Sequence, residues 1–186
     1  MPDKEELRRV LLQTRRAVAP TLRASWDKAI SARIGDWCRA RPCAMLGVYW
    51  PIRGEPDLHL LYAELTTAGI ALALPVVVGR DQPLRFAAWT PGDAMVTDDY
   101  GISIPAVQDF SIIPDTLLIP CVGFNRARYR LGYGGGFYDR TLAALPRPAT
   151  IGVAYANAEA EFEGAAHDIA LDAIVTEAGT IGRLVS

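Results

Sequence analysis

Between residues 44 and 78 the chain changes from strand-like to helical and back to strand-like composition, and this alternation limits the possible folds strongly. The segment AMLGVYWP (44–51) is short, apolar and closed by proline, and IALALPVVV (70–78) is similarly apolar. Between them, DLHLLYAELTTAG (57–69) has helical periodicity and ends in glycine. This order predicts a βαβ unit, which implies parallel strands with helices on the faces of the sheet.

Helical and strand-like segments continue to alternate on both sides of this unit. Before it, apolar residues recur every three or four positions in two segments, for which Asp3 and Thr21 are the expected helix N-caps. After it come LRFAAW (84–89), DTLLIPCVGF (115–124, stopped by Pro120), the helical GGFYDRTLAAL (135–145), ATIGVAYA (149–156) and DAIVTE (172–177). Because we find no repeat, low-complexity tract or linker, we expect residues 1–186 to form a single-domain, three-layer α/β fold. Its central sheet is expected to be mostly parallel and flanked by helices.

Composition and charge exclude several classes of protein. Hydrophobic residues make up 51% of the 186 residues and charged residues 22%, which is ordinary globular usage and argues against disorder. The net charge of −2 argues against a general nucleic-acid binder, which carries a strongly basic domain. No apolar run approaches the roughly 20 residues of a membrane span, so we expect a cytoplasmic protein. Cys38, Cys43 and Cys121 lack CxxC spacing and are expected to be buried, reduced thiols rather than a disulfide framework or a zinc site.

Four glycines are concentrated in RLGYGGGFYDR (130–140), after a predicted strand and at the start of a predicted helix. Glycine loses more conformational entropy on folding than other residues, so the cluster needs positive φ angles or a ligand against bare backbone. Ligands of open α/β sheets lie beyond the carboxyl ends of the strands, and amides at a helix start attract anions. The segment therefore predicts a nucleotide-phosphate site, with a tight structural turn as the alternative. Phe137 and Tyr138 rule out a Walker A loop, and Phe137 rules out the dinucleotide fingerprint.

Charged residues near the glycines fit the same hypothesis. Asp139 begins the predicted helix, where a carboxylate can either favour the helix dipole or hold Mg²⁺ beside a phosphate. Since Mg²⁺ at phosphates is commonly held by one or two carboxylates, a second carboxylate is expected from elsewhere, and Asp168 is the candidate. Arg130 and Arg140 flank the glycines, and either could neutralise phosphate charge or be a solvated surface residue; we favour Arg130.

The segment RLGYGGGFYDR, preceded by LLIPCVGFN, resembles the signature of the 5-formyltetrahydrofolate cyclo-ligase family, also called methenyltetrahydrofolate synthetases. The resemblance spans nearly the whole chain, and the other matching segments are KEELR, YWPIRGEPD, ALPVV, DDYGISIP, IGVAYA and HDIALDAIVTE. It implies an enzyme that converts 5-formyltetrahydrofolate and ATP into 5,10-methenyltetrahydrofolate, ADP and phosphate, using Mg²⁺. We expect a monomer with a small-molecule substrate and no nucleic-acid or membrane partner.

The resemblance also implies roles for individual residues. Lys4 and Arg130 are the implied catalytic residues. The implied nucleotide contacts are Lys4, Arg8, Arg130, Leu131, Gly132, Tyr133, Gly134, Gly135, Gly136, Phe137 and Tyr138. The implied folate contacts are Trp50, Glu55, Tyr133, Gly134, Gly135, Gly136 and Phe137, and the implied magnesium ligands are Asp139 and Asp168. Without the resemblance, Lys4 and Arg8 would be assigned to a solvated helix face, Trp50 to the core and Glu55 to a helix entry.

Four positions depart from the family pattern, namely Ile104, Asn125, Arg128 and Phe137. The usual residues are aspartate at Asn125 and glycine at Arg128, which leaves room for a differently shaped turn at residues 126–129. Phe137 lacks the hydroxyl of the usual tyrosine, and Ile104 replaces a common glutamate, so any role of that segment is open. The roles of His59 and His167 are open as well. A non-catalytic nucleotide- or folate-binding relative and a purely structural domain are the competing hypotheses.

Overall fold

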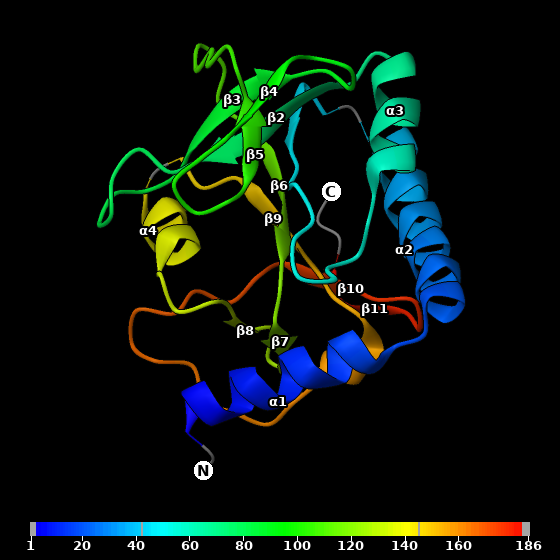
Figure 1. The fold of residues 1–186 in the computed structure, drawn as a ribbon, viewed down its shortest axis with the longest axis vertical. Helices are drawn as coiled ribbons and strands as arrows, with labels where there is room; N and C mark the ends of the chain where they lie inside the picture. Colours follow the sequence, from blue (N-terminus) through cyan, green and yellow to red (C-terminus); the bar gives the residue numbers. More distant parts are fainter. Residues whose placement is uncertain (1–2, 42, 145, 184–186) are drawn as a thin grey trace.

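A seven-stranded sheet forms the centre of the computed structural model, which describes residues 3–41, 43–144 and 146–183 (Figure 1). The strand order across the sheet is β11-β10-β9-β6-β1-β2-β3. These strands are β1 (Met45–Gly47), β2 (Ala71–Val76), β3 (Arg85–Trp89), β6 (Thr116–Pro120), β9 (Ala149–Val153), β10 (Ala173–Val175) and β11 (Thr180–Gly182). The helices are α1 (Lys4–Ala17), α2 (Pro20–Ala40), α3 (His59–Thr67), α4 (Phe137–Ala143) and the short 3-10 helix η1 (Ala156–Ala158).

The predicted βαβ unit is present at the centre of this sheet. β1 and β2 pair in parallel, with Leu46 opposite Leu72, and α3 connects them. The strands β6, β9 and β10 continue the parallel arrangement on the other side of β1, whereas β3 and β11 are antiparallel edge strands. The strand order therefore reverses at β1. In open α/β sheets, ligands bind beyond the carboxyl ends of the strands at such a reversal, so the ends of β1 and β6 are the expected place for a site.

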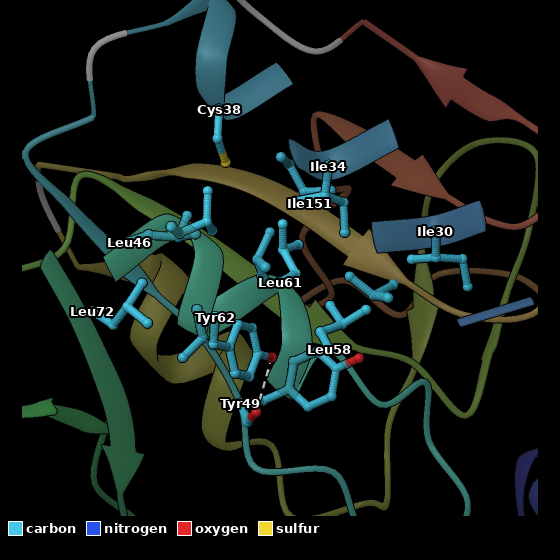
Figure 2. Packing of buried hydrophobic residues seen from close by; sticks show 14 of the residues in the cluster. Ile30, Ile34, Cys38, Leu46, Tyr49, Leu58, Leu61, Tyr62, Leu72 and Ile151 are labelled. Carbon is cyan, nitrogen blue, oxygen red and sulfur yellow. Dashed lines mark hydrogen bonds between the residues drawn. The ribbon is translucent and has the colours of Figure 1, made fainter. Parts of the chain in front are cut away.

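The helices α2 and α3 lie side by side and cover one face of the sheet (Figure 1). Ile30 and Ile34 of α2 and Leu61 of α3 are at most 2% exposed and belong to one apolar cluster with the sheet (Figure 2). Each fully buried aliphatic side chain contributes about 2 kcal/mol to folding. The hydroxyl of Tyr62 donates a hydrogen bond of 3.0 Å to the carbonyl of Tyr49, so the buried polar end of this tyrosine has a partner.

The opposite face of the sheet is covered in part by α4, which gives the protein three layers (Figure 1). Leu142 of α4 is 2% exposed and packs in a second apolar cluster with Met45, Leu117 and Ile174 of the sheet. The expected three-layer α/β fold with a mostly parallel sheet is confirmed.

Two small hairpins and α1 complete the structure around the carboxyl ends of the strands. The hairpins are β4 (Met95–Thr97) with β5 (Ser103–Pro105), and β7 (Gly123–Phe124) with β8 (Arg130–Leu131). The first packs against β2 and β3. α1 lies across the second (Figure 1), where Leu11 packs with Val122, Leu131 and Phe162. This packing holds the N-terminal helix next to the glycine-rich segment that follows β8.

Several smaller expectations differ from the structure. α2 begins at Pro20 with Ala19 as its N-cap, so the expected cap at Thr21 is wrong. Proline suits the first helical position, because a backbone N–H there would have no carbonyl partner within the helix. The glycine segment does not directly follow β6, since the β7–β8 hairpin comes between them. Cys43 is partly exposed, whereas Cys38 and Cys121 are buried as expected. Within the described ranges, no helix has both the length and the apolar character required to cross a bilayer.

Candidate active site

A cavity of about 570 Å³ opens at the carboxyl ends of β1, β2 and β6. Tyr49 and Trp50 follow β1, Pro75 lies near the end of β2, Pro120 ends β6, and all of them line the cavity. Its volume is typical of small-molecule sites. Since it lies where the strand order reverses, we identify it as the candidate active site.

The glycine segment 132–136 forms one wall of this cavity. Gly134 and Gly136 have φ angles of +95° and +66°, which glycine adopts without the steric cost that other residues meet. Gly132 and Gly135 do not have positive φ angles, but a Cβ on Gly135 would lie 2.8 Å from a ring carbon of Phe137. A Cβ on Gly132 would lie 2.7 Å from Nη1 of Arg130. The positive φ angles at Gly134 and Gly136 and the nearby Phe137 ring at Gly135 favour glycine, and the result is a wall of bare backbone.

The helix α1 brings two cations to the cavity. Lys4 and Arg8 both line it, as expected of side chains four residues apart on one helical face. The ammonium group of Lys4 donates to Oδ2 of Asp168 at 2.9 Å. Nε of Arg8 donates to the carbonyl of Gly132 at 2.8 Å. These contacts connect α1 to the glycine segment and to the loop that carries Asp168.

Asp168 is held as a carboxylate by the groups around it. Its side chain is 14% exposed, and its Oδ2 also accepts the amide N–H of Ala165 at 2.7 Å. Burial acts to raise the pKa of Asp168, but the hydrogen bonds from Lys4 and Ala165 and the nearby positive charges outweigh it, and the pKa is lowered. His167 is mostly exposed, and its Nε2 lies 3.6 Å from Oδ1 of Asp168.

Arg130 and Asp139 form a second, more deeply buried ion pair on the cavity wall. Nη2 of Arg130 lies 3.0 Å from Oδ1 of Asp139, and the two side chains are only 6% and 18% exposed. The guanidinium also lies over the ring of Tyr138, 5.3 Å from its centre. Nε and Nη2 of Arg130 nevertheless have no hydrogen-bond partner among the described residues, because the short contact to Asp139 is not aligned as a hydrogen bond. Buried donors of this kind are available to an anionic ligand.

The two carboxylates suit a magnesium ion that arrives with phosphate. Asp139 and Asp168 both line the cavity, and each has one oxygen beside a cationic side chain. In the part of the chain that the structure describes, no three His, Cys, Asp or Glu side chains gather into a metal site. Mg²⁺ in nucleotide sites is held by one or two carboxylates, with phosphate oxygens and water completing its coordination. The donor set therefore fits a nucleotide-bound Mg²⁺.

Glu55 lies behind the cavity wall rather than on it. It is 3% exposed and does not line the cavity, whereas Tyr133 does. Its Oε1 accepts the hydroxyl of Tyr133 at 2.7 Å, and its Oε2 accepts the N–H of Ile52 at 2.9 Å. Burial raises the pKa of Glu55 although these hydrogen bonds oppose the shift.

Arg15 is a residue of this region that the sequence analysis did not single out. It is 3% exposed, and it donates through Nη1 to the hydroxyl of Tyr133 at 3.3 Å and through Nη2 to the carbonyl of Cys121. Arg15 follows Arg8 by seven residues, or two helical turns, and therefore lies on the same face of α1 as Lys4 and Arg8. This spacing could have identified Arg15 from the sequence. Arg15 thus positions Tyr133 from behind.

Aromatic residues line two further parts of the cavity. Trp50 packs edge-on against His59 and Trp89, with ring centres 4.5 and 6.1 Å away, and His59 does not line the cavity. Tyr100 of the β4–β5 hairpin lies edge-on to Phe137, with ring centres 5.9 Å apart, and both residues line the cavity. The hairpin therefore supplies a wall that the sequence analysis did not assign.

Comparison with known proteins decides the family. The model of the 5-formyltetrahydrofolate cyclo-ligase family matches residues 1–177. The chain belongs to this family. The prediction of an enzyme of this kind is thereby confirmed, and the segments whose resemblance carried it all lie within the matched range.

Relatives of the cyclo-ligase family match along most of the chain. The 5-formyltetrahydrofolate cyclo-ligase of Mycoplasma pneumoniae is 29% identical over 94% of this chain and 99% of its own length. The cyclo-ligase of Mycolicibacterium smegmatis is 30% identical over 94% of this chain and 93% of its own length. The solved structure of a 5,10-methenyltetrahydrofolate synthetase from M. pneumoniae matches with a TM-score of 0.77 at 28% identity, covering 95% and 99%. The solved structure of the Aquifex aeolicus 5,10-methenyltetrahydrofolate synthetase matches with a TM-score of 0.83 at 27% identity. The match covers 98% of this chain and 96% of the Aquifex chain.

The departures from the cyclo-ligase pattern have local explanations. Arg128 has a φ angle of +67°, the region that glycine favours, and its Nε donates to the carbonyl of Leu171 at 2.9 Å. The side chain of Asn125 accepts the N–H of Tyr129 and closes the same turn. Ile104 is 6% exposed in a small apolar cluster and does not line the cavity.

Proposed function

We propose that this protein catalyses the ATP-dependent cyclisation of 5-formyltetrahydrofolate to 5,10-methenyltetrahydrofolate, with release of ADP and phosphate. The observation that supports it most is the cavity at the reversal of strand order, where bare glycine backbone meets Lys4, Arg8, Arg130 and two carboxylates. The substrate class follows from the names of the family and its relatives. A monomer acting in the cytoplasm is part of the proposal.

The chemical problem is that the formyl oxygen of the substrate is a poor leaving group. Transfer of the γ-phosphoryl group to that oxygen forms an O–P bond, breaks the bond to ADP and activates the formyl carbon. N10 of the same molecule then attacks this carbon and loses its proton, and the C–O bond breaks to release phosphate. The protein has to align the two substrates and neutralise developing charge, and it needs no covalent nucleophile.

The cations of the cavity suit the nucleotide side of this reaction. Arg130 would bind the transferred phosphoryl group, because its buried Nε and Nη2 have no other hydrogen-bond partner among the described residues. Lys4 would neutralise charge beside it. Arg8 holds the carbonyl of Gly132 and would keep the segment 131–138 against the phosphates. These assignments retain the nucleotide contacts expected from the resemblance.

Asp139 and Asp168 would hold Mg²⁺ on the nucleotide. When bound, the ion would neutralise charge on the phosphoryl oxygens. The contribution of the chain is to keep both carboxylates on the cavity and Asp168 ionised, which the contacts to Arg130, Lys4 and Ala165 achieve.

Trp50, Glu55 and the segment 133–137 form the proposed folate side. Trp50 would stack on the pterin, held by its contacts with the rings behind it. Glu55 would bind the amino-pyrimidine edge, for which the hydroxyl of Tyr133 has to leave the carboxylate that it now contacts. Binding of folate would therefore move Tyr133.

The test is turnover of purified protein with 5-formyltetrahydrofolate, ATP and Mg²⁺, followed by the absorbance of the methenyl product. We expect product only when ATP is present. Binding of both ligands without product would favour the non-catalytic relative. Failure to bind ATP in equilibrium dialysis would favour the purely structural domain.

A further inference from the structure

Arg53 occupies a backbone conformation that arginine rarely adopts. It lies with Gly54 at the centre of a tight turn, in which the N–H of Glu55 donates to the carbonyl of Ile52 at 3.0 Å. Arg53 has a φ angle of +50° and Gly54 of +75°, the arrangement in which asparagine or glycine is favoured at the first central position. A residue held in a disfavoured conformation raises the question of what its side chain does.

The side chain of Arg53 lies on the wall of the cavity. It lines the cavity beside Trp50, and its guanidinium stands over the ring of Tyr133, 5.1 Å from the ring centre. In the absence of ligand, this stacking orients the planar group without using its N–H donors. The turn therefore presents a cation to the ligand.

Among the described residues, Arg53 differs from the other cationic side chains on the cavity in having neither an ion pair nor a side-chain hydrogen bond. Lys4 and Arg130 have carboxylate partners and Arg8 binds the carbonyl of Gly132. His167 lies beside Asp168. For the side chain of Arg53, neither a hydrogen bond nor an ion pair is present among the described residues. Burial raises the pKa of Glu55, and the charge of Arg53 acts in the opposite direction. An anion from the ligand is the partner that its donors lack.

We propose that Arg53 binds the glutamate carboxylates of the folate substrate and so selects glutamyl folates. This inference rests on the proposed function. The phosphates of ATP already have Lys4, Arg8 and Arg130 next to the glycine segment, whereas the glutamate of the substrate is its remaining anionic part. Arg53 follows β1 together with Trp50, on the proposed folate side, and a guanidinium can bind a carboxylate through two parallel hydrogen bonds.

The test combines a change in the residue with a change in the ligand. Arg53→Gln is compared with wild type for 5-formyltetrahydrofolate monoglutamate and for 5-formyltetrahydropteroate, which lacks the glutamate. We expect the KM and the dissociation constant for the glutamyl compound to rise about tenfold, as for loss of one charge-assisted pair. For the pteroate compound we expect less than about a twofold change, and an unchanged KM for ATP. Arg85→Gln is the matched control, because Arg85 also stacks on an aromatic ring, Phe110, but does not line the cavity.

Several results would overturn the proposal. Equal losses for both folates would mean that Arg53 only positions Tyr133 or the turn. A raised KM for ATP would make it a phosphate contact. The dissociation constants, measured by fluorescence titration, keep this test separate from turnover. If wild type is inactive but Arg53→Gln weakens binding of the glutamyl compound alone, the result contradicts the proposed function and supports the role of Arg53. No difference between the folates in wild type would exclude a carboxylate contact.

Discussion

Arg130 is the residue whose environment is hardest to explain without a ligand. A guanidinium that is only 6% exposed has one carboxylate neighbour, Asp139, and two N–H groups without hydrogen-bond partners among the described residues. Taking a charge out of water is costly unless it is paired and hydrogen-bonded. The cost is understandable at a site that binds phosphate, where the free donors and the charge are both used.

Asp139→Asn should therefore affect both stability and turnover. The change keeps the shape but leaves the buried guanidinium without its counter-charge, so we expect a loss of about 3 kcal/mol in the free energy of unfolding. We also expect weaker dependence of turnover on Mg²⁺. Asp168→Asn is the comparison in urea denaturation, and because its partner Lys4 is 34% exposed we expect a loss below about 1 kcal/mol. Equal losses in the two variants would contradict the burial of the Arg130 pair as the cause.

Gly135→Val tests whether the glycine segment faces the nucleotide. The added side chain would meet the Phe137 ring, which starts 2.8 Å from the position of the new Cβ, so the segment has to shift. We expect the dissociation constant of ATP to rise at least about tenfold, equivalent to ~1.4 kcal/mol. Gly179→Val is the control, since a Cβ there meets no atom of the described residues within 4 Å. Unchanged ATP affinity in Gly135→Val would show that the segment lies away from the nucleotide.

At the scale of elements, α1 is the part that organises the site. One face of α1 carries Lys4, Arg8 and Arg15, which contact the Asp168 loop, the glycine segment and Tyr133 in turn. The helix is held by apolar packing of Leu11 against the β7–β8 region. The same helix thus joins three segments that are far apart in the sequence.

Lys4→Met should raise the pKa of Asp168, because the Lys4 hydrogen bond and charge oppose the effect of burial. Because the pKa of Asp168 is lower in the folded protein, the carboxylate stabilises the folded state at pH values above the ordinary pKa of 3.8. This stabilisation is lost as the pH falls through the pKa of the folded state. We therefore expect the variant to be less stable than wild type above about pH 4, and the difference to shrink as the pH falls below that value. An NMR titration of the Asp168 carboxyl carbon without Mg²⁺ measures the pKa directly. Arg9→Met is the control; it should raise the pKa of Glu6 and leave Asp168 unchanged, and an unmoved Asp168 in Lys4→Met would contradict the pairing.

Elements with a clear period could be predicted from the sequence, and those fixed by distant partners could not. The βαβ unit and α1 follow from apolar spacing, and the glycine cluster predicted the wall of the cavity. The β7–β8 hairpin is only two residues long in each strand, too short for a pattern to show. The burial of Glu55 behind Tyr133 and the pairing of Arg15 depend on which segments meet, which sequence spacing does not encode.

At the scale of the whole molecule, the strand topology determines where the cavity lies, and the side chains around it supply its charged and aromatic groups. The reversal of strand order at β1 opens the cavity at the ends of β1, β2 and β6. α1 adds cations from one side and the β4–β5 hairpin adds an aromatic wall from the other. In the proposed function, this arrangement would bring a nucleotide and a pterin together in one cavity, which phosphoryl transfer between them requires.

The central claim is that the γ-phosphoryl group passes to the formyl oxygen in this cavity. The direct measurement is turnover of 5-formyltetrahydrofolate that carries ¹⁸O in its formyl group, followed by mass spectrometry of the released phosphate. We predict that the label appears in inorganic phosphate and that one ADP forms for each methenyl product. Label that is absent from the phosphate, or product that forms without ATP, would contradict the account.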